Sequence, residues 1–357
     1  MNKYYLIILF LFTFLISHSQ NVFTDIYFEK ARLEIDSMLS GKKPLDFKKA
    51  VSLSENAYFE NSVDYSKFDS TIQFYTELIE AYMQSNPLIY KGADYENVAR
   101  NSAIFSFMTD TTWFTDKYIA KLPYSYNFND YNGDSDWTNT FVFKLLETNL
   151  GNCRSLPYLY KILSEELGAK AYLALAPNHM YIRCYSERTG WYNVELTNAM
   201  FPIDAWISAS GYIQLEAIQK GVFMDTLSLK QSVTFCLFDL AKNCEKKYGF
   251  KTFPFISDCL DTVLVHYPNC INALIYKAEI LKKRFDIYMN LYDAKEYTEI
   301  LQYETPNEIY TEMESLYVKI LEFGYREMPE KMYREWLISL NQNKEKYNNL
   351  KIKFNFR

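Results

Sequence analysis

The chain has 357 residues and a formal net charge of −6, and 49% of its residues are apolar while 23% are charged. This length suits one large domain or two modest ones, and the composition excludes an intrinsically disordered chain and a collagen-like one. With ten Gly and ten Pro the sequence also argues against a turn-rich all-β protein, and its mild acidity offers no electrostatic surface for nucleic acid.

Residues 1–19 have the pattern of a secretory signal peptide. Lys3 precedes an apolar run from Tyr4 to Ile16 that is too short to span a bilayer as a typical helix, and small residues at positions 17 and 19 fit cleavage before Gln20. An N-terminal membrane anchor is the alternative interpretation. No later apolar stretch is long enough to cross a membrane, so we expect an exported protein, periplasmic or extracellular, with no span after signal removal.

The mature chain divides into three predicted zones. Residues 20–125 are predicted to be helical, because apolar residues such as Ile72, Tyr75 and Ile79 recur at helical spacing. A loop rich in Asn, Asp and Tyr over residues 126–133 then opens a zone of mixed structure that runs to residue 225. Residues 226–357 are predicted to be helical again, with one weakly tetratricopeptide-like unit and a mildly basic, solvated tail from Lys344.

The middle zone alternates helix and strand signals. Residues 145–149 are expected to form the last part of a helix that stops at Gly151. A second helix is expected from about Asn152 to Leu167, with Gly168 just past its end. Three strand-like runs follow, over residues 171–176, 179–185 and 191–196. A polar loop over residues 186–190 joins the last two runs into a predicted hairpin.

The histidines and cysteines limit the chemistry that the chain can perform. Of three histidines, His18 leaves with the signal and His266 lies between two helices, which leaves His179 as the candidate base. All six cysteines lie between residues 153 and 270, and export would permit disulfides among them. Their spacing matches no metal-binding pattern, so we expect neither a metal nor a cofactor.

Cys153 lies at the predicted start of a helix, where unpaired amides and the helix dipole favour a thiolate. Pro157 leaves two positions open for the first helical turn. If Asn152 is the N-cap, the proline removes an early hydrogen bond; if Ser155 is the N-cap, the proline fits better and Cys153 lies on the preceding loop.

His179 and Glu195 are predicted to face each other across the hairpin. Each lies on the less apolar face of its strand, and a loop centred near Glu187 would place them directly opposite. A carboxylate beside an imidazole holds its orientation and tautomer, as the third member of a catalytic triad does. Asp204 is an alternative carboxylate, although Pro202 and additional chain separate it from the strand.

These motifs resemble the transglutaminase-like superfamily. The resemblance rests on a Gly-Asn-Cys-Arg-Ser-Leu run at residues 151–156, a following helix, Asn178-His179 at the start of a strand, and Gly-Trp-Tyr-Asn-Val-Glu-Leu-Thr at residues 190–197. It covers roughly residues 135–200 and is similar in particular to a bacterial branch with a helical N-terminal region and a helical or tetratricopeptide-like tail. Asn139 and Phe141 also fit that branch.

The resemblance implies a papain-related α+β core, in which a helix bearing the cysteine packs on a small antiparallel sheet. It implies a Cys-His-Asp triad with Cys153 as nucleophile and His179 as base. Glu195 stands where the family usually has Asp, one methylene longer, and Leu196 replaces the usual Pro. Some members lack the cysteine, so membership alone does not establish activity.

Five further residues are candidates for an oxyanion donor or for the edge of the site: Trp137, Asn139, Asn178, Arg183 and Trp191. Family precedent suggests an upstream donor beside the Cys153 amide, while a structural role is the competing interpretation for Trp137 and Asn139. The sequence thus predicts amide acyl transfer on a peptide or protein substrate, as a peptidase, deamidase or cross-linking enzyme. The alternative is a non-catalytic module that binds a peptide or a protein.

Overall fold

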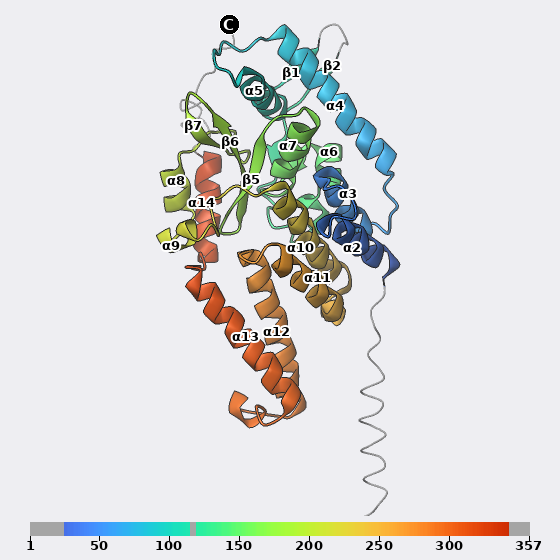
Figure 1. The fold of residues 1–357 in the computed structure, drawn as a ribbon, viewed down its shortest axis with the longest axis vertical. Coiled ribbons are helices and arrows are strands. Elements are labelled where there is room, and N and C mark those ends of the chain that lie inside the picture. Colours follow the sequence, from blue (N-terminus) through green and yellow to red (C-terminus); the bar gives the residue numbers. More distant parts are fainter. Residues whose placement is uncertain (1–24, 115–118, 343–357) are drawn as a thin grey trace, which may run out of the picture.

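The structure is a computed structural model that describes residues 25–114 and 119–342, so the predicted signal segment and the basic tail lie outside the described residues. Within these ranges helices dominate, and small sheets lie in the middle of the chain between two helical regions (Figure 1). The predicted α+β class with helical flanking regions is confirmed. No helix in this part of the chain is both long and apolar enough to span a bilayer.

The N-terminal region consists of helices that begin at aspartates. Asp25, Asp46 and Asp64 each accept hydrogen bonds from backbone amides of the first turn, which satisfies donors that have no partner inside the helix. The helices are α2 (Ile26–Leu39), α3 (Phe47–Tyr58), α4 (Tyr65–Ser85) and α5 (Tyr95–Thr109).

The prediction of helix up to residue 125 is wrong for its last part. Thr112–Phe114 forms strand β1 and pairs antiparallel with β2, Ile119–Lys121. Thr112 and Phe114 are buried while Trp113 is exposed, which is the period-two pattern of a strand and not the period of a helix. Ser125–Tyr126 forms β3, so the loop begins one residue later than predicted.

The segment that carries Cys153 begins with the short helices η1 (Trp137–Thr140) and α6 (Val142–Thr148). Helix α6 ends before Gly151, because Asn149 adopts a left-handed conformation with φ of 57°. Leu150–Gly151 then forms β4, which pairs in parallel with β3. The chain therefore reaches Cys153 from a strand and not directly from a helix.

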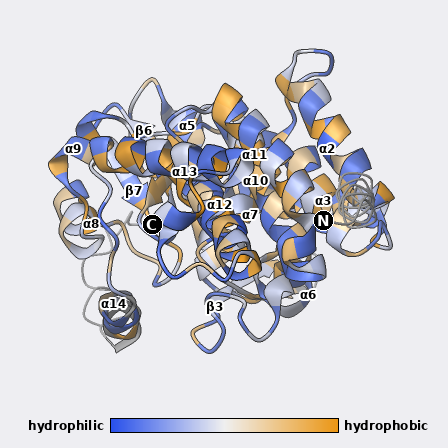
Figure 2. Cartoon of the chain, turned by 90° about the horizontal axis from the view of Figure 1, so that it is seen from below, coloured by the Kyte–Doolittle hydropathy of each residue, from blue (hydrophilic) through white to orange (hydrophobic). Residues whose placement is uncertain are grey.

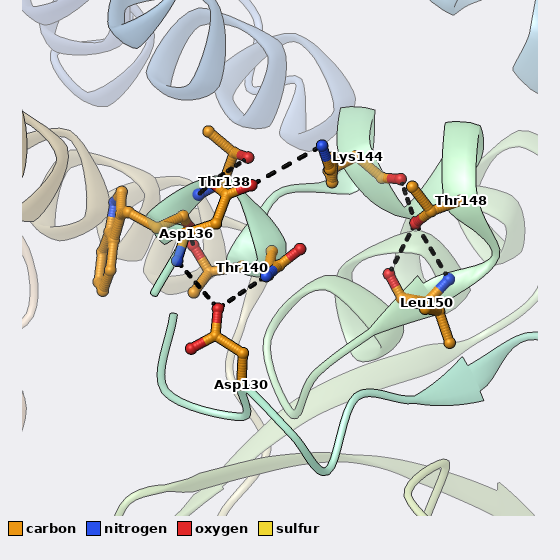
Figure 3. Close-up of polar contacts among 9 residues, drawn as sticks. Asp130, Asp136, Thr138, Thr140, Lys144, Thr148 and Leu150 are labelled. Atoms are coloured by element: carbon orange, nitrogen blue, oxygen red, sulfur yellow. Dashed lines mark hydrogen bonds and ion pairs between the residues drawn. The ribbon is translucent and has the colours of Figure 1, made fainter. Parts of the chain in front are cut away.

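Carboxylates hold the loop before α6 in place (Figure 3). Asp130 accepts hydrogen bonds from the amides of Ser135 and Asp136 and, at 2.7 Å, from the Asn139 side chain. Asp136 caps η1 through the Thr138 amide at 3.0 Å and lies 3.7 Å from the Lys144 ammonium. Asn139 is thus part of the loop's own framework.

The central sheet is an antiparallel meander in the order β5–β6–β7. Its strands are β5 (Ala171–Ala176), β6 (His179–Ser186) and β7 (Gly190–Val194), so the three predicted strands are confirmed with small shifts at their ends. Helix α7 (Ser155–Glu166) packs on β5 and β6, and Gly168 follows it with φ of 68°, as predicted. The helix is buried along nearly its whole length, which fixes the position of its first turn.

Helices make up the C-terminal region, as predicted. After the short α8 (Asp204–Ser210) and α9 (Leu215–Gln219) come α10 (Leu229–Tyr248), η2 (Phe250–Thr252), α11 (Phe253–His266), α12 (Ile271–Leu291), η3 (Tyr297–Glu299), α13 (Glu304–Glu322) and α14 (Glu330–Gln342). Helices α12 and α13 form a hairpin at one end of the molecule, while α14 turns back beside α8 and the central sheet (Figure 1). All six cysteines are unpaired, and five of them are buried.

Gly151 is packed too closely to accept a side chain. A Cβ atom there would lie 2.7 Å from Ser155 Oγ and 2.8 Å from Leu145 Cδ1. We predict that Gly151→Ala lowers the free energy of unfolding by about 1–3 kcal/mol, measured by urea denaturation, and also changes the alkylation rate of Cys153.

Gly168→Ala is the matched control for this prediction. Gly168 has a positive φ but an open surrounding, so its substitution strains the backbone and leaves the turn of Cys153 intact. An unchanged alkylation rate in Gly151→Ala would show that Gly151 does not position the thiol.

Candidate active site

Cys153 lies on the turn immediately before α7, and the structure combines the two capping arrangements that the sequence left open. The Asn152 side-chain oxygen accepts hydrogen bonds from the amides of Arg154 and Ser155 at 2.9 and 3.1 Å. Ser155 Oγ in turn accepts a hydrogen bond of 3.0 Å from the Asn152 backbone amide. Helix α7 begins at Ser155, so Pro157 falls in the first turn, where a missing amide hydrogen costs nothing. The predicted helix start at Asn152 is therefore three residues early, and Cys153 does not belong to the apolar stripe of the helix.

A second contact anchors this turn to the C-terminal region. The Arg154 guanidinium forms an ion pair with Asp239 on α10, and Asp239 also accepts a hydrogen bond from Tyr158 at 2.6 Å. Arg154 lies 5.2 Å from the ring of Phe235 as well. The turn that carries the thiol is thus held from both sides, and a fixed positive charge lies near it.

His179 opens β6 directly after a tight turn. Ala176 pairs with His179, and the intervening Asn178 adopts a left-handed conformation with φ of 55°. The Asn178 carbonyl faces the thiol, whose Sγ lies 3.8 Å away. The turn therefore brings both the imidazole and a backbone acceptor to Cys153.

Glu195 reaches His179 from a register that differs from the prediction. Val194 pairs with Ile182, so Glu195 lies diagonal to His179 and not directly opposite. The reason is that Gly190, with φ of 72°, already pairs with Ser186, which centres the loop on Arg188 and not on Glu187. A shift of two residues preserves the face of the strand, and the longer glutamate side chain spans the diagonal.

The contact between His179 and Glu195 is short and buried. Nε2 lies 2.6 Å from Glu195 Oε2, and the other carboxylate oxygen accepts the Thr197 amide at 2.8 Å. Burial alone would lower the pKa of His179, but the Glu195 charge and the Cys153 thiol outweigh it and raise that pKa to about 10. Burial likewise opposes ionisation of Glu195, yet the His179 charge holds the pKa of this carboxyl below its usual value.

The Cys153 thiol and the His179 imidazole influence each other. His179 Nδ1 is buried and has no hydrogen-bond partner within the described residues, but the two side chains are close enough to shift each other's pKa. Burial opposes the thiolate, but the interaction with His179 and the Arg154 charge overcome it and lower the pKa of Cys153. Cysteine and histidine thus favour the thiolate–imidazolium form, the reactive state of a thiol nucleophile.

Cys153 and His179 open onto a cleft of about 830 Å³. It extends from the central sheet towards α12 and α13. Aromatic side chains from several elements line the cleft: Tyr131, Trp137, Phe235, Phe238, Tyr276, Tyr317 and Tyr325. Charged side chains are interspersed among them: Asp134, Arg154, Lys242, Glu279 and Glu327. A cleft of this size and mixed character accommodates several residues of a peptide.

Two residues of α14 also lie at the site, and the sequence did not predict them. Tyr333 OH donates a hydrogen bond of 3.1 Å to the Asn178 carbonyl and lies 4.0 Å from Cys153 Sγ. The ring of Trp336 meets the His179 ring edge to face, with centroids 5.0 Å apart. No local pattern could have indicated these contacts, because Tyr333 and Cys153 are 180 positions apart.

The two upstream candidates have structural partners. Trp137 lines the cleft, but its indole Nε1 donates to Asn243 Oδ1 at 2.8 Å. The Asn139 side chain donates to Asp130 Oδ2 at 2.7 Å. Both arrangements match the structural interpretation, and neither side chain points a free donor at Cys153.

Of the three remaining candidates, one lies at the site and two have partners elsewhere. Asn178 contributes its carbonyl to the site, whereas Arg183 pairs with Asp204 at 3.1 Å, and the exposed Trp191 packs on Tyr172 with ring centroids 5.8 Å apart. Asp204 is thus the partner of Arg183, and Glu195 is the carboxylate on His179.

His266 lies outside the site. His266 is the final residue of α11, as expected for a residue between helices. Within the described ranges, no cluster of His, Cys, Asp or Glu is arranged to hold a metal ion. Comparison of the chain with known proteins found no matching family model, no matching curated protein and no matching solved structure.

The pKa shifts predict how the thiol reacts. In the folded protein, alkylation by iodoacetamide is expected to modify Cys153 alone, because burial raises the pKa of the other five thiols. The alkylation rate of Cys153 is expected to reach half its maximum at a pH below the pKa of an ordinary thiol, which is about 8.5. Rates measured by mass spectrometry against pH test this directly.

Glu195→Gln keeps the length of the side chain but removes its charge. The pKa of His179 should fall, and alkylation of Cys153 near neutral pH should slow by about tenfold for each unit by which the thiol pKa rises. Asp204→Asn is the matched control, because Asp204 pairs with Arg183 on the same sheet and does not touch the histidine. Equal rates in the two variants would contradict the assignment of Glu195.

Proposed function

We propose that this chain is an exported thiol enzyme of the transglutaminase-like type that transfers the acyl group of an amide. The observation that carries the proposal is the contact of 2.6 Å between His179 Nε2 and Glu195, on a buried imidazole that lines the same cleft as Cys153. A buried carboxylate, an imidazole and a partly exposed thiol in this order form the arrangement of a Cys-His-acid triad.

The local topology supports the same proposal. The thiol precedes a buried helix, the imidazole opens the middle strand of an antiparallel meander, and the carboxylate follows the next strand. This is the order in which the transglutaminase-like resemblance places its triad. Independently of the resemblance, the signal-peptide pattern of residues 1–19 supports export.

The proposed reaction begins with attack by the Cys153 thiolate on the amide carbonyl. The Cys153 amide is a suitable donor for the oxyanion, since no hydrogen bond among the described residues engages it, while those of its neighbours Asn152, Arg154 and Ser155 are occupied. The His179 imidazolium then gives its Nδ1 proton to the leaving amine, and a thioester remains on Cys153.

The acceptor decides the product. If water attacks the thioester, His179 takes its proton and the net reaction is hydrolysis, as in a peptidase or a deamidase. If a second amine attacks, the net reaction is cross-linking. The cleft of about 830 Å³ is large enough for peptide segments, so the proposed substrate is a peptide or a protein.

The decisive test compares the wild-type protein with His179→Ala. Alkylation of Cys153 at about pH 6 to 7 should slow by at least tenfold in the variant, because the thiol loses the imidazolium that stabilises its anion. Equal and slow alkylation in both proteins would overturn the enzymatic proposal and favour a non-catalytic binding module.

Turnover requires a second measurement. A library of peptide amides, assayed with and without a primary amine, should yield a Cys153 thioester that mass spectrometry detects and that is absent in Cys153→Ala. Cys244→Ala is the matched control, because this thiol is buried in the core. A library that yields neither product nor thioester would count against catalysis on peptides.

A further inference from the structure

The described part of helix α14 makes close contacts with the two reactive groups. Tyr333 and Trp336 are three residues apart and therefore lie on one face of the helix. Tyr333 is buried against the Asn178 carbonyl and Cys153, and its ring lies 5.8 Å from that of Tyr131. Trp336 covers the His179 ring and lies 6.2 Å from the ring of Trp206 on α8.

These contacts occupy space that the reaction needs. An amide carbonyl must approach Cys153 Sγ to about 3–3.5 Å, with the leaving nitrogen on the side of His179. The Tyr333 hydroxyl now lies 4.0 Å from this sulfur, and the Trp336 ring lies against the imidazole. A substrate that uses both groups must therefore displace these two side chains.

Helix α14 is placed so that it can move away. It lies at the margin of the molecule beside α8, apart from the α12–α13 hairpin (Figures 1 and 2). Its other face is solvated: Met332 and Ile338 are exposed, and Lys331 lies 3.8 Å from Glu335 of the same helix. A helix that is held through one aromatic face and is solvated on the other belongs to the part of a fold that opens at low cost.

The surface beneath α14 defines what it can bind. Tyr131 and Trp206 supply aromatic walls, and the Asn178 carbonyl supplies one hydrogen-bond acceptor, which the Tyr333 hydroxyl now satisfies. This surface matches a segment with a tyrosine and a second aromatic side chain one helical turn away. It is continuous with the open cleft, which Tyr333 also lines.

We propose that the groove occupied by Tyr333 and Trp336 binds the acyl-donor segment of the substrate, a peptide segment with two aromatic side chains, and that α14 is its internal occupant. Helix α14 thus covers one side of the thiol site until an aromatic substrate segment displaces it, while the other side opens onto the cleft. That the bound segment is a substrate rests on the proposed function. Whether α14 occupies the groove can be tested without turnover.

The test measures alkylation of Cys153 in the full-length chain. The double variant Tyr333→Ala, Trp336→Ala should be alkylated by iodoacetamide about tenfold faster than wild type, because the thiol is uncovered. Tyr333→Phe removes only the hydroxyl, which also helps to lower the pKa of Cys153, so its rate should stay well below that of the double variant. The matched control, Met332→Ala together with Ile338→Ala on the solvated face, should leave the rate unchanged.

The five buried cysteines report on folding in the same experiment, since they become labelled only if the chain unfolds. A synthetic peptide with the sequence of residues 330–342 should slow alkylation in the double variant, and the same peptide with both aromatic residues replaced by Ala should not. Equal rates in the double variant and the wild type would overturn the proposal. A wild-type rate that falls with rising protein concentration would also overturn it, because α14 would then close the site of a second copy.

The outcomes separate this proposal from the proposed function. If His179→Ala slows alkylation but the α14 variants do not change it, the triad stands and the closure by α14 fails. If the α14 variants expose a thiol whose reactivity does not depend on His179, the closure stands and the enzymatic proposal fails.

Discussion

The structure of the site depends on one buried charge pair, His179 with Glu195. Two charged groups in the interior lose their hydration, and such a pair persists only when the remaining hydrogen-bonding capacity is satisfied. Here the Thr197 amide satisfies the second carboxylate oxygen, and the pair of hydrogen bonds between Glu195 and Met200 holds the backbone that carries it. The charge on the imidazole in turn stabilises the thiolate. Strand pairing, carboxylate and nucleophile are therefore energetically coupled.

The sequence was sufficient for those parts of the site in which local rules act. The position of His179 at the start of a strand follows from the turn before it, and the location of Cys153 near a helix start follows from the capping residues Asn152 and Ser155. The face on which Glu195 lies follows from strand alternation. The register was wrong because the pairing of Gly190 depends on its left-handed backbone, which the loop's composition does not reveal.

Two other features lay beyond local reasoning. The strand at Thr112–Phe114 has only three residues and closely follows a helix, and its alternating burial and its pairing with Ile119–Lys121 distinguish it. The presence of Tyr333 and Trp336 at the thiol depends on how the C-terminal helices fold back over the sheet, and no periodicity encodes a contact over that separation. Sequence reasoning therefore predicted that His179 and Glu195 lie close together but did not predict the α14 side chains beside His179 and Cys153.

That all six cysteines are unpaired has a consequence for how oxidants react with this protein. Because none of the six sulfurs is bonded to another and five are enclosed by the core, folding requires no oxidation step, and the core presents no thiol to an oxidant. Cys153 alone combines partial exposure with a stabilised anion, the combination that oxidants such as peroxides attack first. Among the thiols of this chain, Cys153 is therefore the one that an oxidant reaches in the folded protein.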